Sequence, residues 1–259
     1  MTCSEPQIMG VLNVTPDSFS DGGLYTDAED AVRHAFEMHD SGASIIDIGA
    51  ESTRPGFTPV PEDEEIRRLI PVIRRIRESS DMRISVDTMK AGTMRAALDA
   101  GADIINDVNG LRGEGMMELA ASSGAEVVIM HMRGQPSDTH SEDMHGDVLA
   151  QIKSFLDGQV ERAIDAGVRR SDIILDPGVG FGKSMEDNEL IIDSSSYFSD
   201  DLRILVGASR KRVLKTMYPG MDRDEATVRA SLRAIASGAS IVRVHNVGLM
   251  QSALRRQAN

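Results

Sequence analysis

The sequence predicts a single α/β domain, a closed barrel of eight parallel strands that alternate with helices. Three observations favour this fold. Short apolar runs alternate eight times with longer helical patterns, the runs barely alternate in polarity, and polar side chains follow every run. A doubly wound open sheet is the alternative, but no GxGxxG motif follows the first run. We treat residues 1–259 as one domain because no linker or low-complexity segment interrupts the alternation.

The apolar runs are rich in Ile and Val, as expected for parallel strands that are covered on both faces. Gly-Ala pairs precede several runs, for example at Gly42 and Gly101. They predict helices that end on glycine and turn tightly into a strand. The predicted strands are Ile8–Leu12, Ser44–Ile48, Arg83–Val86, Ile104–Ile105, Glu126–Met130, Ile173–Leu175, Ile204–Val206 and Ile241–Val244.

Between the runs, apolar residues recur at three- and four-residue spacing, the pattern of helices with one buried face. In segment 64–76 the expected buried stripe is Ile66, Leu69, Ile70, Ile73 and Ile76. The predicted helices include Ala28–Ser41, Glu62–Glu78, Thr93–Ala100, Met116–Ser123 and Asp147–Ala166.

Composition excludes several classes of function. The net charge of -13 argues against binding to nucleic acid or to an anionic membrane surface. The single cysteine, Cys3, rules out an internal disulfide and disfavours a thiolate metal site. No apolar run approaches the roughly 20 residues of a membrane span, and the start, MTCSEPQ, lacks signal-peptide features. We therefore expect a cytoplasmic protein.

Polar groups at the end of every predicted strand indicate a functional face, because in a barrel these ends converge on one mouth. A single such group is usually a cap or turn residue, but every strand carries at least one. The residues at or just after the strands include Asn13, Asp47, Asp87, Asn106, His131, Asp176, Ser209, Lys211, Arg243 and His245.

The first strand ends in a dense cluster of small polar and acidic residues, NVTPDSFSDGG. Asn13 stands at the mouth of the strand, where its amide oxygen could reach a cation or a phosphate. Asp17 and Asp21 lie four residues apart with Phe19 between them. Loops on rigid strands are common places for catalytic residues. The alternative is a turn of helix-capping residue types before the next helix.

Seven segments in order resemble the dihydropteroate synthase family over nearly the whole chain. That family joins a dihydropterin bearing a hydroxymethyl diphosphate to 4-aminobenzoate, releases pyrophosphate and usually needs Mg²⁺. The resemblance implies this reaction, whereas the periodicity of the sequence predicts only a barrel with polar residues at its mouth. The segments are NVTPDSFSDGG, ESTRPG, SVDTMK, INDVNG, DPGVGFGK, GASRKR and RVHNV.

The resemblance implies a pterin site of paired carboxylate, amide and ammonium groups at Asp87, Asn106, Asp176 and Lys211. A pterin presents donors and acceptors along one edge. Asp176 would accept from the ring amino group and N3, Asn106 from a neighbouring donor, and Lys211 would donate. Such matching discriminates strongly, because a wrong ring leaves buried polar groups unpaired.

For the diphosphate, the resemblance implies Asn13, Arg243 and His245. Arg243 and His245 alternate on the last strand and should face the same side of the mouth, and arginine offers a bidentate fork to phosphate. Asn13 would bind Mg²⁺, which prefers oxygen ligands beside substrate phosphates. Because no residue looks like a nucleophile, we expect pyrophosphate to leave before the amine attacks. Asp21, or less favourably Asp17, would stabilise the positive charge that develops.

The resemblance also implies an aminobenzoate site, and the chain departs from the usual family pattern at two positions, Arg212 and Asn246. Arg212 stands where many members have Ser, and it could pair with the carboxylate of the amine or point to solvent. Asn246 replaces a common Asp after the histidine. The implied residues are Phe19, Thr53, Arg54, Pro55, Phe181 and Arg212.

Two other functions share parts of this pattern. A pterin-binding methyltransferase barrel, which passes a methyl group to a corrinoid protein, would not need the SRK turn or the Arg243/His245 pair. A barrel that only senses a phosphorylated pterin would not need Asp21. The family also tends to dimerise through helices remote from the mouth, so we expect a homodimer.

Overall fold

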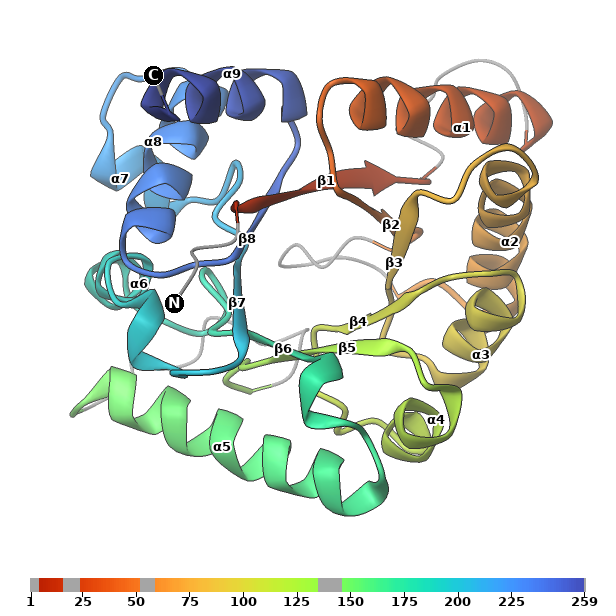
Figure 1. Cartoon of the computed structure of the whole chain (residues 1–259), viewed down its shortest axis with the longest axis horizontal. Coiled ribbons are helices and arrows are strands. Elements are labelled where there is room, and N and C mark those ends of the chain that lie inside the picture. Colours follow the sequence, from red (N-terminus) through yellow and green to blue (C-terminus); the bar gives the residue numbers. More distant parts are fainter. Residues whose placement is uncertain (1–4, 16–23, 52–58, 135–145, 259) are drawn as a thin grey trace.

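The protein is a closed barrel of eight parallel strands with an outer layer of helices. In the computed structural model, which describes residues 5–15, 24–51, 59–134 and 146–258, adjacent strands follow sequence order and β1 pairs with β8. Figure 1 shows the helices arranged around the strands. The closed order excludes the open doubly wound sheet and confirms the predicted fold. The strands are β1 (Gln7–Asn13), β2 (Ile45–Gly49), β3 (Arg83–Asp87), β4 (Ile104–Asp107), β5 (Glu126–Met130), β6 (Ile173–Asp176), β7 (Arg203–Val206) and β8 (Ile241–Val244).

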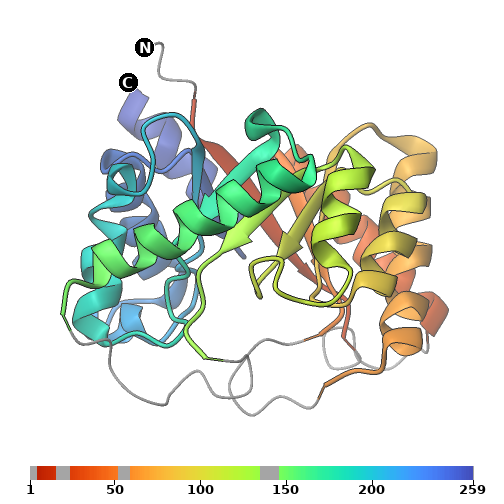
Figure 2. The same ribbon diagram turned by 90° about the horizontal axis from the view of Figure 1, so that it is seen from below.

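Helices connect the strands on the outside of the barrel. α1 and α9 flank β1 in Figure 1, and in the view of Figure 2 α5 runs diagonally across the outer face. No helix in the described ranges is both long enough and apolar enough to cross a membrane. The helices are α1 (Leu24–Asp40), α2 (Glu62–Ser79), α3 (Ala91–Asp99), α4 (Met116–Ser123), α5 (Val148–Ala166), α6 (Met185–Ile192), α7 (Val213–Met217), α8 (Arg223–Ala236) and α9 (Val247–Ala258), with 3₁₀ turns η2 (Arg170–Asp172) and η3 (Ser195–Tyr197).

The predicted elements match the observed ones closely. β5, β8 and α4 have the predicted bounds, whereas α1 begins earlier than expected, at Leu24. The Gly-Ala joints also form as predicted, since Gly42 and Gly101 adopt φ of 109° and 110°, a conformation that glycine reaches without the penalty of a Cβ. On α2, Leu69 and Ile73 are fully buried, and Ile66 at the edge of the stripe is partly buried.

Side chains that point into the barrel form three layers, because every second residue of a strand faces inward. The middle layer is an apolar plug of residues from seven strands. The layer at the amino-terminal ends of the strands contains Arg83, Glu126 and Arg203. The layer at the carboxyl-terminal ends contains most of the polar residues that the sequence singled out, and it rests on the plug. The plug consists of Met9, Ile45, Ile104, Val128, Ile174, Leu205 and Ile241.

Candidate active site

An arginine and two carboxylates lie at the centre of the carboxyl-terminal layer. Arg243 on β8 donates from Nε to Asp47 Oδ2 at 2.6 Å and from Nη2 to Asp87 Oδ2 at 2.9 Å. Asn106 Nδ2 on β4 donates to Asp47 Oδ1 at 3.1 Å. Each residue comes from a different strand, so the closed barrel alone brings them together. This cluster forms the floor of the mouth.

The carboxyl groups of the mouth are held in unfavourable surroundings for a negative charge. Burial, with a smaller contribution from the nearby Asp47 carboxylate, raises the pKa of Asp87 to about 7, although the Arg243 guanidinium acts in the opposite direction. Burial also raises the pKa of Asp176, and the Lys211 ammonium opposes that effect. Perturbed carboxyl groups of this kind concentrate at binding and catalytic sites.

A tight turn after β6 shapes one wall of the mouth. Asp176 Oδ1 accepts a hydrogen bond from the Gly178 N–H at 2.7 Å. The Lys183 ammonium donates to the carbonyl oxygens of Gly178 at 2.7 Å, Phe181 at 3.0 Å and His131 at 3.3 Å. Gly178 has φ of +73°, and a Cβ there would lie 1.9 Å from the His131 oxygen, so only glycine fits. The turn therefore fixes Asp176 against the end of β5.

Lys211, from the loop after β7, lies across the same turn. Its ammonium donates to the Val179 carbonyl oxygen and stands 4.3 Å from the centroid of the Phe181 ring. Burial lowers the pKa of Lys211 to about 8, although the Asp176 carboxylate acts in the opposite direction. Arg243 influences both Asp176 and Lys211 electrostatically. The floor and the wall thus belong to one site.

Two further titratable groups lie behind this wall. Burial lowers the pKa of Lys183 to about 7. Burial, together with the Lys183 charge, lowers the pKa of His131 to about 3. The His131 Nδ1 atom is buried and has no hydrogen-bond partner among the described residues, and its ring meets Phe155 edge-on. His131 is therefore a neutral imidazole at physiological pH.

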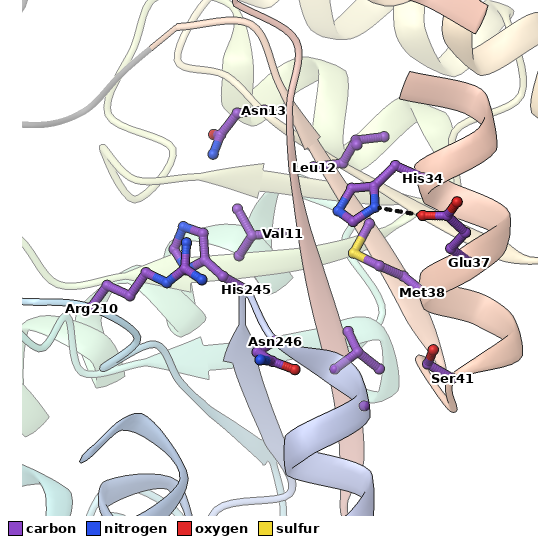
Figure 3. Close-up of a pocket in the computed structure, with 12 residues that line it drawn as sticks. Val11, Leu12, Asn13, His34, Glu37, Met38, Ser41, Arg210, His245 and Asn246 are labelled. Atoms are coloured by element: carbon purple, nitrogen blue, oxygen red, sulfur yellow. Dashed lines mark hydrogen bonds and ion pairs between the residues drawn. The ribbon is translucent and has the colours of Figure 1, made fainter. Parts of the chain in front are cut away.

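A pocket of about 530 Å³ opens beside the mouth, bordered by the end of β1, by α1 and by the β8–α9 connection. Figure 3 shows Asn13, His245 and Arg210 on one side of it, with His34 and Glu37 of α1 on the other. His245 is oriented by Ser209, whose Oγ lies 2.8 Å from His245 Nδ1. Asn13 and His245 therefore border one space, next to the floor that holds Arg243.

The predicted site residues fall into four groups, one of which, Asn13 and His245, borders the pocket described above. Those expected to bind the pterin gather with Arg243 over the apolar plug, and Phe181 packs beneath Lys211. Arg212 is exposed next to α7, and Asn246 Nδ2 donates to Asp224 at 3.1 Å outside the floor. The remaining predicted residues lie outside the described ranges: Asp17, Phe19, Asp21, Thr53, Arg54 and Pro55.

Comparison with known proteins agrees with this architecture. A model of the family described as "Pterin binding enzyme" matches residues 9–245. The dihydropteroate synthase of Escherichia coli K12 is 40% identical over 255 residues, which span 97% of this chain and 90% of that protein. This chain belongs to the dihydropteroate synthase family. It is therefore a transferase of folate biosynthesis.

Solved dihydropteroate synthases have the same fold. The enzyme of Xanthomonas albilineans, in a structure with 4-aminobenzoic acid, superposes with a TM-score of 0.91 at 40% identity and covers 100% of this chain and 94% of its own. The enzyme of Yersinia pestis, in a structure with a sulfonamide drug complex, gives a TM-score of 0.91 at 39% identity, over 99% of this chain and 94% of its own.

Three residues at or behind the mouth were not among the predicted site residues: the buried Asp47 and His131, and the partly buried Lys183. The signal for Asp47 was a charge within the otherwise apolar strand Ile45–Gly49, since a buried charge requires a partner. The partner of Lys183 is a set of carbonyl oxygens, which no side-chain pattern reveals.

A second ionic cluster lies beside the mouth. Lys90 Nζ lies 2.9 Å from Glu51 Oε2 and 3.0 Å from Glu65 Oε2, and Glu65 is fully buried. Glu51 Oε2 also accepts from the Val60 N–H at 2.6 Å. Glu51 and Val60 lie on either side of segment 52–58, so this cluster holds the two flanks of that segment together.

The described residues include one candidate oxygen ligand for a metal ion at the mouth. Among the described residues, no group of three His, Cys, Asp or Glu side chains could hold a metal. Asn13, at the end of β1, offers one amide oxygen beside the pocket. Because Mg²⁺ usually keeps several waters and is completed by substrate phosphates, one protein ligand is compatible with such a site.

Proposed function

We propose that the mouth binds a 7,8-dihydropterin-6-ylmethyl diphosphate with its ring on the apolar plug and its diphosphate toward Asn13 and His245. The enzyme then joins the pterin methylene carbon to the amino nitrogen of 4-aminobenzoate and releases pyrophosphate. The observation that carries this proposal is the convergence of Asp87, Asn106 and Asp176 with two cations above the plug.

The site would recognise the ring through hydrogen bonds to the donors and acceptors along its polar edge. Asp176, held by the Gly178 N–H, would accept from the ring amino group and N3. Asn106 would accept from a neighbouring donor, and Lys211 would donate to a ring acceptor while its stem covers the ring. Desolvation makes each of these hydrogen bonds discriminating, because a mismatched ring would leave a buried charge unpaired.

The diphosphate would lie beside the side chains of Arg243 and His245. His245, oriented by Ser209, and Arg243 would face its oxygens, and Asn13 would be the protein ligand of Mg²⁺. The bound ion would neutralise charge on the departing diphosphate. Arg243 already pairs with Asp47 and Asp87, so its approach to phosphate would require one of these contacts to be shared.

Departure of pyrophosphate would leave a cation at the pterin methylene, delocalised into the ring; the nitrogen lone pair of the aromatic amine would form a bond to that carbon, and the resulting ammonium would lose one proton to solvent. Asp21, with Asp17 as the alternative, would stabilise the positive charge; preorganised groups of this kind contribute about 3 to 4 kcal/mol each. The amine would contact Phe19, Thr53, Arg54, Pro55 and Phe181, and its carboxylate would approach Arg212. A homodimer and a cytoplasmic location are further predictions from the sequence.

Titration calorimetry with the pterin diphosphate, with and without Mg²⁺, tests binding, and a pyrophosphate-release assay with and without 4-aminobenzoate tests turnover. We expect Mg²⁺ to tighten binding and the amine to be required for release. Binding without amine-dependent release would leave only a sensor, and corrinoid-dependent demethylation would indicate a methyltransferase. A panel of amines, including ribosylated ones, would then define the second substrate.

A further inference from the structure

Asp47 lies beneath the predicted ligand residues. It faces inward from the middle of β2, in register with Val11 of β1 and Ser85 of β3, and it is completely buried. It contacts Asn106 through both carboxylate oxygens, at 3.1 and 3.2 Å, and Arg243 through Oδ2 at 2.6 Å. One buried carboxylate therefore joins a residue of the pterin site to a residue of the diphosphate site.

The charge of Asp47 determines which way the Asn106 amide points. An ionised carboxylate only accepts hydrogen bonds, whereas an amide group has a donating nitrogen and an accepting oxygen. Asn106 must therefore turn its NH₂ group toward Asp47. Its oxygen, which has no donor among the described residues, is then the atom that can meet a ligand. Asn106 is 5% exposed, so a mismatched ligand atom at this oxygen would be poorly compensated by water.

Asp47 also restrains the guanidinium of Arg243. Nε is held by Asp47 and Nη2 by Asp87, so two strands fix the plane of the group across the floor. Charge-assisted bonds of this kind are stronger and more directional than neutral ones. Removal of the Asp47 charge would release both the amide and the guanidinium.

We propose that Asp47 is a positioning residue that fixes Asn106 as a hydrogen-bond acceptor toward the heterocycle and anchors Arg243 beside it. The site therefore selects flat rings that offer an N–H donor at Asn106 and rejects rings that offer an acceptor there. This inference rests on the proposed function, and it explains why the proposed site would bind some rings and reject others.

An exchange of the two side chains tests this role while net charge is conserved. Asp47→Asn leaves two amides facing each other, and Asn106→Asp leaves two carboxylates facing each other. In the double variant, the introduced amide at position 47 can donate to the introduced carboxylate at 106 and still accept from Arg243. The double variant also keeps an acceptor oxygen toward the ligand.

The measurement is the dissociation constant of 6-hydroxymethyl-7,8-dihydropterin, which lacks the diphosphate. We expect each single variant to bind it at least about tenfold more weakly, and the double variant to recover to within about threefold of the wild type. A loss in the double variant equal to the product of the single losses would overturn the proposal, because independent structural damage is additive in free energy.

The matched control is Glu126→Gln, which removes one charge from an arginine-paired carboxylate at the other end of the barrel. Its affinity for the pterin should stay within about twofold of the wild type. A tenfold loss in this control would mean that any charge change in the barrel weakens binding, which would also overturn the specific role of Asp47.

Nuclear magnetic resonance of the wild type gives a test that does not depend on the variants folding. The Asn106 side-chain NH₂ protons should exchange slowly and show no Overhauser contact to the ring-methylene protons of bound pterin; such a contact would overturn the proposal. Wild-type turnover is measured first. If the wild type neither binds pterin nor releases pyrophosphate, the proposed function fails, whereas additive losses in an active enzyme exclude only the role of Asp47.

Discussion

The two ends of the barrel interior carry similar groups in different surroundings. At the amino-terminal end, Glu126 pairs with Arg83 and Arg203, and the three side chains are 28%, 32% and 31% exposed. At the mouth, Arg243 is 23% exposed, but its partner Asp47 is not exposed at all and Asp87 is only 12% exposed. The apolar plug separates the two clusters.

The difference in burial between the two clusters indicates which of them has a function other than stability. Exposed ion pairs contribute little to stability because water competes for both partners. Buried pairs lose the hydration of both charges, and a hydrophobic replacement is often equally stable. The mouth therefore carries an arrangement that stability alone does not favour, and recognition of a ligand gives it a reason.

The largest expected effect is the loss of Arg243. Arg243→Ala leaves the buried Asp47 and the nearly buried Asp87 without their cation, and a broken buried ion pair typically costs about 3 to 5 kcal/mol. Arg203→Ala, at the partly exposed end, should cost less, about 0 to 1 kcal/mol. Urea unfolding of both variants at pH 7.5 measures the two values. Equal losses would show that burial does not distinguish the two ends.

The next effect concerns ligand affinity. Lys211→Ala or Asp176→Asn should weaken pterin binding by about 1 to 3 kcal/mol with little loss of fold, the usual range for hydrogen bonds to charged groups. Lys211 also loses its contact with the Phe181 ring. Lys153→Ala, a lysine on α5 that is 38% exposed and pairs with Asp157, is the control in calorimetry. Unchanged affinity in Lys211→Ala would refute its assignment to the pterin site.

A third effect is acid sensitivity that arises at the mouth. Native His131 stays neutral down to about pH 3, whereas an unfolded histidine binds a proton near pH 6.5. Between these values the unfolded state binds more protons, so stability falls as the pH falls, by up to about 1.4 kcal/mol per pH unit.

His131→Gln should remove this part of the slope. Urea unfolding at several pH values between 4 and 7 compares the variant with the wild type. Above pH 7 the two pH profiles should run parallel, which serves as the internal control. A variant that keeps the full acid slope would place the sensitivity elsewhere in the molecule.

The sequence pattern predicts the strands well but cannot show which residues share a layer. Asp47 and Arg243 are separated by 196 positions, and their contact depends on the register of a closed barrel. Family resemblance pointed to Asp87, Asn106 and Asp176 because they stand in recognisable motifs. Asp47 is no less central to the floor, but its role depends on two neighbours that no local motif contains.

Backbone conformation explains the other omissions. Lys183 follows the motif GVGFG, yet its role comes from three carbonyl oxygens that a turn with positive φ at Gly178 brings together. His131 ends a predicted strand like several polar residues of the mouth, but only the packed structure shows that its ring packs edge-on against Phe155. A residue type at a strand end therefore predicts proximity to the mouth, not its role there.

The smallest expected effect tests what determines the contribution of a charged side chain to ligand binding: its exposure to solvent or its position near the mouth. Arg212 lies near the mouth but is exposed, so solvent should screen its charge at least as strongly as the charges of the partly exposed arginines at the opposite end. If it faces the carboxylate of 4-aminobenzoate, Arg212→Ser should raise the KM for that amine by about two- to fivefold, corresponding to at most about 1 kcal/mol, and added salt should reduce the difference. Arg203→Ser should leave the KM unchanged. A change above about tenfold that salt does not reduce would mean that the bound amine buries Arg212. The exposure of Arg212 in the free enzyme would then not predict the size of its effect.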